Sequence, residues 1–246
     1  MSQENTIRTT IDDITLITLD DNKVNAFNKQ LIAGLNEALD QTPHDHGAVV
    51  IAGRSGVLSA GFDLKVVASG DADTTIDLIA AGGRLLGRVF EFPRPVVIAC
   101  TGHAPALAAL LLLTGDYRVG ADGDFVIGLN EVRDNLVIPR CFLELAHHRI
   151  PPIHRTKTVL HSLMYQPGTA RSVGFLDEVV APEEVIATAI EHAGRLSALA
   201  HPAYGITKRR ERGQAAARIY ESLETELTED VLDMIAGDLG ETRRGG

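Results

Sequence analysis

Apolar and polar residues alternate at the start of the chain and then recur at helical spacing. The alternation over Ile7 to Thr10 and Ile14 to Leu19, on either side of Asp12-Asp13, predicts a β-hairpin with an acidic turn. Apolar residues spaced about four apart between Asn25 and Asp40 predict an amphipathic helix. The continuous apolar run Ala48 to Ala52 predicts a strand that is buried on both faces.

The middle of the chain repeats this order of strands and helices. The predicted elements are a loop over Gly53 to Gly61, a turn over Ser69 to Thr74, a helix over Thr75 to Phe90, a strand over Pro95 to Cys100, a turn over Thr101 to His103, an apolar helix over Ala104 to Leu113 and a strand over Asp116 to Val119. Strands that alternate with helices in this way are typical of an α/β protein with right-handed crossovers.

Beyond about Pro139 the helical pattern dominates. We predict helices over residues 141–149, 152–164, 182–199, 202–211 and 213–237, and one short strand over Asp177 to Val180. The sequence therefore predicts two regions, a strand-containing core over residues 1–180 and a helical C-terminal region over residues 181–246.

Composition narrows the classes of function. The 246 residues carry a formal net charge of −10 without a basic stripe, which argues against a nucleic-acid partner. The longest apolar run, from Ala104 to Leu113, is too short to cross a bilayer, and the polar start of the chain does not resemble a signal peptide. Two isolated cysteines fit a reducing compartment. We expect a cytoplasmic protein with no membrane association.

A first candidate for chemistry lies where the strand over Pro95 to Cys100 runs through a glycine turn into a helix. We expect Pro105 in the first helical turn, which leaves the N–H groups of Ala106, Leu107 and Ala108 without intrahelical acceptors. Such donors favour an anion or a developing oxyanion. An ordinary buried helix start capped by water has the same spacing.

Two further stretches could complete a site. The small residues of Ser59 to Gly61 allow a ligand to approach the backbone, and an N–H group there could converge with the helix start to form an oxyanion hole. Glu131 lies between apolar neighbours, so burial would raise its pKa and suit it to proton transfer near neutral pH. A glutamate in a salt bridge or at a helix N-terminus would explain this residue equally well.

Together these stretches resemble the enoyl-CoA hydratase/isomerase (crotonase) family. The resemblance is carried by the order and spacing of Asn25-Ala26, Ala60 to Lys65, Thr101 to Ala104, Gly115 to Val119, Gly128 to Val132 and Ala170 to Val180. It implies an α/β spiral of ββα units followed by a helical trimerisation region. It also implies a homotrimer or a hexamer made of two trimers, an acyl-CoA thioester substrate, and no cofactor, because coenzyme A is part of the substrate.

The resemblance also implies roles for individual residues. The backbone N–H groups of Phe62 and Leu107 would form the oxyanion hole. Phe62, Asp63, Leu64 and Lys65 would line the CoA site. Glu131 matches the family's second catalytic glutamate, whereas Leu110 occupies the position of the first.

Leu110 cannot hold or activate a water molecule, so hydration would need a second polar group. Asp134 is one candidate, since helical spacing would place it on the same face as Glu131, and His103 is another. A single acid–base group suits double-bond isomerisation better than hydration. The alternatives are a non-catalytic acyl-CoA binding protein and another thioester or C–C hydrolytic reaction on the same scaffold.

Overall fold

The computed structural model describes residues 6–69 and 71–227, and its main feature is a six-stranded sheet. The strand order is β1 (Thr6–Ile11), β2 (Ile14–Leu19), β3 (Ala48–Ala52), β5 (Val96–Cys100), β7 (Tyr117–Ala121) and β9 (Glu178–Val180). β1 and β2 pair antiparallel, which confirms the predicted hairpin, and all the other pairs are parallel.

A smaller sheet of three parallel strands lies beside the large one. Its strands are β4 (Gly56–Val57), β6 (Gly102–Pro105) and β8 (Ile127–Gly128). Each of them directly follows a strand of the large sheet along the chain and precedes one or more helices. This repeat confirms the predicted α/β class and its ββα units.

Most helices lie at the predicted positions with altered ends, whereas α2 and α7 were not predicted. They are α1 (Lys29–Asp40), α2 (Leu64–Val67), α3 (Ala72–Glu91), α4 (Leu107–Thr114), α5 (Arg140–Arg149), α6 (Pro152–Arg155), the π-helix η1 (Thr156–Leu160), α7 (Pro167–Val173), α8 (Val185–Ser197) and α9 (His201–Thr225). α1 begins later than predicted because the Asn28 side chain caps it, and α3 begins earlier because Asp71 caps it.

The prediction for residues 101–106 was wrong. Gly102 to Pro105 form strand β6 where we expected a turn and the first turn of a helix, because this segment pairs with β4 and β8. The helix begins only at Leu107, since Ala106 has a φ of 51°, which no helical residue adopts.

Three predictions in the C-terminal third also need correction. The helix expected over 152–164 is split into α6 and a π-helical turn, and it stops before Ser162, whose φ is 46°. Helix α7 was not predicted. The two helices expected over 202–211 and 213–237 form the single helix α9 as far as Thr225, and residues 228–237 lie outside the described residues.

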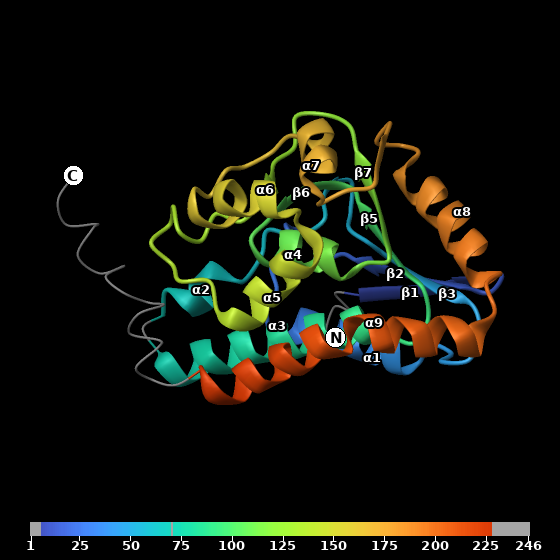
Figure 1. Ribbon diagram of the computed structural model, residues 1–246. Helices are drawn as coiled ribbons and strands as arrows, with labels where there is room; N and C mark the ends of the chain where they lie inside the picture. Colours follow the sequence, from blue (N-terminus) through green and yellow to red (C-terminus); the bar gives the residue numbers. More distant parts are fainter. Residues whose placement is uncertain (1–5, 70, 228–246) are drawn as a thin grey trace.

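The large sheet is covered on both faces, which explains its continuous apolar strands. Alternate residues of β3 point to opposite sides, so that Ile51 joins the main core whereas Val50 packs against α8. Figure 1 shows α8 on one side of the sheet, with α3 and α9 lying along each other on the other side. Among the described residues, no helix has the length and apolar character needed to span a membrane.

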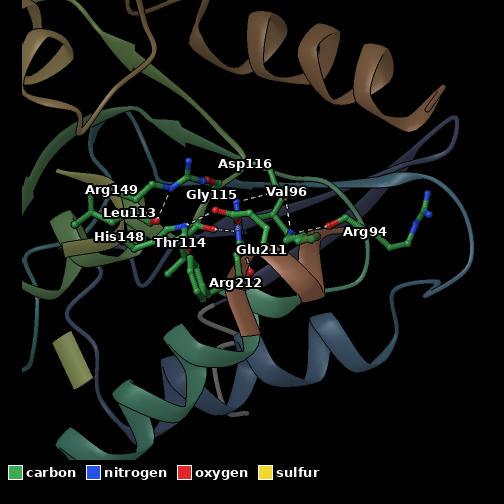
Figure 2. A network of polar contacts seen from close by, with 12 residues as sticks. Arg94, Val96, Leu113, Thr114, Gly115, Asp116, His148, Arg149, Glu211 and Arg212 are labelled. Atoms are coloured by element: carbon green, nitrogen blue, oxygen red, sulfur yellow. Dashed lines mark hydrogen bonds and ion pairs between the residues drawn. The ribbon is translucent and has the colours of Figure 1, made fainter. Parts of the chain in front are cut away.

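A buried ionic network ties α9 to the large sheet (Figure 2). The Asp116 carboxylate accepts hydrogen bonds from Lys208 Nζ at 2.6 Å and from an Arg212 Nη at 2.7 Å. It also accepts the Val96 N–H at 2.7 Å, while Arg212 donates to the carbonyl oxygens of Phe90 and Thr114. Helices α8 and α9 thus pack directly on the strand-containing region, and the boundary near residue 180 stays a prediction.

Candidate functional site

Two backbone segments meet at Gly61. This glycine has a φ of 86°, and a Cβ placed on it would lie 3.3 Å from the Pro105 carbonyl oxygen and 3.5 Å from the Leu107 nitrogen. The loop that ends at Phe62 therefore touches the start of α4 with no room for a side chain between them. The structure brings together the two segments that carry the predicted oxyanion-hole amides.

The Phe62 N–H points away from its neighbouring strand residue. Phe62 and Phe27 form a parallel bridge in which Phe27 N–H donates to Gly61 O at 2.8 Å and Asp63 N–H donates to Phe27 O at 3.0 Å. In parallel pairing, one residue makes both hydrogen bonds and its partner's N–H faces the other way. Within the described ranges, no hydrogen-bond acceptor is recorded for the Phe62 N–H.

The start of α4 presents the second donor. The Ala106 N–H is occupied, because it donates to Gly128 O at 2.9 Å, and the first helical bond runs from Leu110 N–H to Ala106 O. The Leu107 N–H therefore precedes the helical ladder, and no acceptor for it is recorded in the part of the chain that the structure describes. The unusual φ of Ala106 directs this turn, since a non-glycine residue at positive φ is held there by its surroundings.

The predicted CoA-binding residues lie together around the start of α2. The Phe62 ring packs against α3 at Gly82, where an added Cβ would come within 2.7 Å of the ring. Asp63 caps α2 by accepting the Lys65 N–H at 3.0 Å. Leu64 is 70% exposed, and Lys65 is also exposed. This segment presents an aromatic ring, an exposed apolar side chain and a cation on one short stretch.

Glu131 lies in a turn after β8 and combines a partly exposed side chain with one deeply buried oxygen. Its Oε2 is buried and has no hydrogen-bond partner among the described residues. Burial raises the pKa of Glu131 from 4.5 to about 7, and the nearby Asp134 carboxylate adds to the rise, while backbone N–H groups oppose it. Such a carboxyl group can both accept and return a proton near neutral pH.

The two candidate second groups make other contacts. The Asp134 carboxylate accepts from Asn130 Nδ2 and forms an ion pair with Arg133 at 3.2 Å. His103 is exposed on β6, where its Nδ1 accepts the Val126 N–H at 3.2 Å and its ring packs edge-on against Phe125. Asp134 thus stabilises the turn that carries Glu131, while His103 supports the connection between β7 and β8.

Leu110 is 1% exposed and belongs to the main apolar core. Two other polar groups near Glu131 in the structure were not predicted as site residues. The Asn130 Oδ1 is buried and has no partner in the part of the chain that the structure describes, and Ser162 accepts the Arg133 N–H at 3.1 Å. A cavity of about 480 Å³ at the start of α9 is lined by Asp116, Tyr204 and Arg212 among others, and it includes none of the predicted site residues.

The sequence profile of the enoyl-CoA hydratase/isomerase family matches residues 9–229. The chain belongs to this family, as the motif order predicted.

Known proteins that are similar in sequence or structure are named enoyl-CoA isomerases or enoyl-CoA hydratases. The chain is 28% identical to human mitochondrial enoyl-CoA delta isomerase 1 over 200 residues, which cover 80% of this chain and 66% of the human protein. A crystal structure of a probable enoyl-CoA hydratase from Mycobacterium tuberculosis has 37% identity and a TM-score of 0.89, with 93% of this chain and 97% of that chain covered. A second structure of the same Mycobacterium tuberculosis protein, there named an enoyl-CoA isomerase, has 36% identity and a TM-score of 0.86, with 90% of this chain and 96% of that chain covered.

The match spans just under two thirds of the human isomerase. The crystal structures are covered almost completely, so that the crotonase fold extends over nearly the whole chain.

Proposed function

We propose that this protein is an enoyl-CoA isomerase, which moves the double bond of a 3-enoyl-CoA thioester to position 2. The observation that carries the proposal is the pairing of one buried acid, Glu131, with an apolar Leu110 at the family's other glutamate position. Isomerisation needs one group that removes and returns a proton, whereas hydration in the family needs two groups that hold a water molecule.

In the proposed reaction the thioester carbonyl oxygen accepts hydrogen bonds from the Phe62 and Leu107 N–H groups. The ionised Glu131 removes a proton from C2, and the electron pair delocalises into a dienolate whose negative charge lies on the thioester oxygen. The protonated Glu131 then returns the proton to C4, which leaves the double bond between C2 and C3. The substrate and product have the same atoms, and no oxidant, reductant or metal enters the balance.

The electrostatics of Glu131 fit both halves of this cycle. With a pKa of about 7 the group is ionised in a large fraction of molecules at neutral pH, and its conjugate acid is strong enough to protonate a dienolate. Lys65, in a chain of net charge −10, would supply local positive charge for the phosphates of coenzyme A.

We also propose that the protein works in the cytoplasm as a trimer or a pair of trimers. Sedimentation analysis tests the oligomeric state.

The experiment compares isomerisation of 3-hexenoyl-CoA, followed by the absorbance of the conjugated product, with hydration of crotonyl-CoA. We expect the first reaction to be at least about 100-fold faster. Glu131→Gln should reduce isomerisation by roughly 10²–10⁴-fold, since it removes the proton-transfer group, while calorimetry shows retained acyl-CoA binding. Glu37→Gln, on the exposed side of α1, is the matched control and should change neither value.

Other results would replace this proposal. Fast hydration would identify a hydratase, and release of free coenzyme A would identify a hydrolase. Tight binding of acyl-CoA without turnover by the unmodified protein would identify a non-catalytic binding protein.

A further inference from the structure

A segment far from Glu131 in sequence holds the turn that carries it. We infer that Ser162 is a positioning residue, which fixes the Glu131 carboxyl group by accepting the backbone N–H of Arg133. This inference rests on the proposed acid–base role of Glu131. Two tethers join residues 127–133 to residues 162–165, and Glu131 lies between them in the sequence.

The tether upstream of Glu131 is a pair of backbone hydrogen bonds. Ile127 N–H donates to Tyr165 O, and Tyr165 N–H donates to Ile127 O, both at 2.9 Å. Gly128 follows with a φ of 154°, and a Cβ there would lie 3.0 Å from the Leu163 carbonyl oxygen and 3.1 Å from Met164 Sδ. The two segments are therefore in direct backbone contact three residues before Glu131.

The tether downstream of Glu131 is the hydroxyl group of Ser162. The Arg133 N–H donates to Ser162 Oγ at 3.1 Å, across 29 residues of sequence. Ser162 is 5% exposed, so water cannot easily take the place of its hydroxyl. All the other recorded backbone hydrogen bonds of residues 131–136 are made within the turn itself. The Ser162 hydroxyl thus joins the backbone of this turn to a segment that lies 29 residues further along the chain.

The chain holds Ser162 in an unfavourable conformation to make this contact. Its φ of 46° lies in the left-handed region, which costs a non-glycine residue free energy unless its surroundings impose it. Ser162 lies two residues after the π-helix η1, and hydrogen bonds hold the residues around it. His161 N–H donates to Thr156 O at 3.1 Å, and the buried Thr158 hydroxyl bonds the Tyr165 hydroxyl at 3.0 Å. π-helical turns are rare and occur frequently at functional sites.

Loss of the Ser162 hydroxyl should act on Glu131 through the backbone. An unpaired Arg133 N–H would draw the turn toward water, and water would then reach the buried Oε2. The charged side chain that acts on Glu131 within the described residues is Asp134, which belongs to the same turn as its ion-pair partner Arg133. They would move with it, so that renewed solvation of Glu131 is the dominant change and lowers its pKa.

The test uses Ser162→Ala and Ser162→Gly. Both remove the acceptor, but glycine also relieves the left-handed strain, so the two variants should differ in thermal stability and agree in catalysis. For each we expect kcat for 3-hexenoyl-CoA to fall about tenfold, with KM changed by less than about twofold, because residues 62–65 are untouched. The acid limb of the kcat profile should move to lower pH. Ser222→Ala removes another buried hydroxyl, from α9, and should leave the profile unchanged.

A readout that does not need turnover separates this inference from the proposed function. Titration of the Glu131 side-chain carboxyl carbon by NMR should show a lower pKa in both Ser162 variants than in the unmodified protein. If the unmodified protein does not isomerise 3-enoyl-CoA but the titration still moves, the positioning role stands and the proposed function fails. If kcat and the titration are both unchanged in Ser162→Ala and Ser162→Gly, the positioning role is wrong.

Discussion

The start of α4 is joined to the end of β8 by the hydrogen bond from Ala106 N–H to Gly128 O, and α4 and the turn after β8 offer opposite kinds of group. α4 is apolar and fully buried, so it offers only backbone N–H groups, and its Leu110 is part of the core. The turn at residues 130–136 is largely exposed and offers the Glu131 side chain, whose buried Oε2 has no hydrogen-bond partner within residues 6–69 and 71–227. In the proposed reaction the buried region would stabilise developing charge, and the less buried region would move the proton.

The largest expected effect is a loss of stability when Leu110 of α4 is shortened, with no change in the pH dependence of kcat. Leu110→Ala should lower the free energy of unfolding by about 2–5 kcal/mol, because it leaves a cavity in the main core. Denaturant titration measures this loss. The acid limb of the kcat profile should stay in place, since no titratable group changes. A shifted limb would mean that Leu110 takes part in setting the environment of Glu131.

The next effect is a change in stability that depends on pH, and it comes from Glu131 in the turn after β8. Because burial raises the pKa of Glu131 from 4.5 to about 7, ionising it destabilises the folded state increasingly between these pH values. Glu131→Gln should therefore raise the free energy of unfolding by up to about 3 kcal/mol at pH 8 and by almost nothing at pH 4. Unfolding curves at the two pH values test this. An equal effect at both would show that Glu131 is solvated.

A third effect tests the contact between the two regions. Gly61→Ala places a methyl group against Pro105 O and Leu107 N and should lower kcat about 100-fold, as the loss of one oxyanion-hole donor does. Gly56→Ala is the matched control, because Gly56 has nearly the same φ of 85° but no atom within 4 Å of an added Cβ. Equal losses of kcat in the two variants would attribute the effect to backbone strain alone.

The smallest effect concerns Asp134. Asp134→Asn removes a charge that contributes to the raised pKa of Glu131 but keeps a side-chain oxygen for Asn130. We expect the acid limb to move down by only a few tenths of a pH unit, as for a mostly exposed charge, with little change in kcat. A loss of kcat above about tenfold would instead support Asp134 as a second catalytic group.

The parts of the fold that were predicted are those fixed by local pattern. β3 and β5 read as continuous apolar runs because both faces of the large sheet are covered, and α1 and α3 show clear helical spacing. Strand β6 was mistaken for a turn because its Gly-His-Ala-Pro sequence has no strand pattern and depends on pairing with β4 and β8. Long-range hydrogen bonds of this kind leave no local signal.

In the candidate site, too, local motifs could be predicted from the sequence, whereas features that depend on long-range contacts could not. Family motifs located Phe62, Leu107 and Glu131, and the pKa rise at Glu131 follows the expectation from its apolar neighbours. The role of Ser162 could not be predicted, because it depends on a left-handed residue after a π-helix and on a hydrogen bond across 29 residues. The catalytic roles of the predicted residues stay predictions.

The ion pairs between Asp116 and α9 also impose an order on synthesis of the chain. Arg212 follows Asp116 by 96 residues, so at roughly 5–20 residues per second the carboxylate waits about 5–20 s for this cation to leave the ribosome. Until then the Asp116 carboxylate lacks both of its ion-pair partners, so that its burial beside β7 is costly. The nascent strands must stay partly open, in need of protection from aggregation, and a fragment ending near residue 180 would remain in that condition permanently.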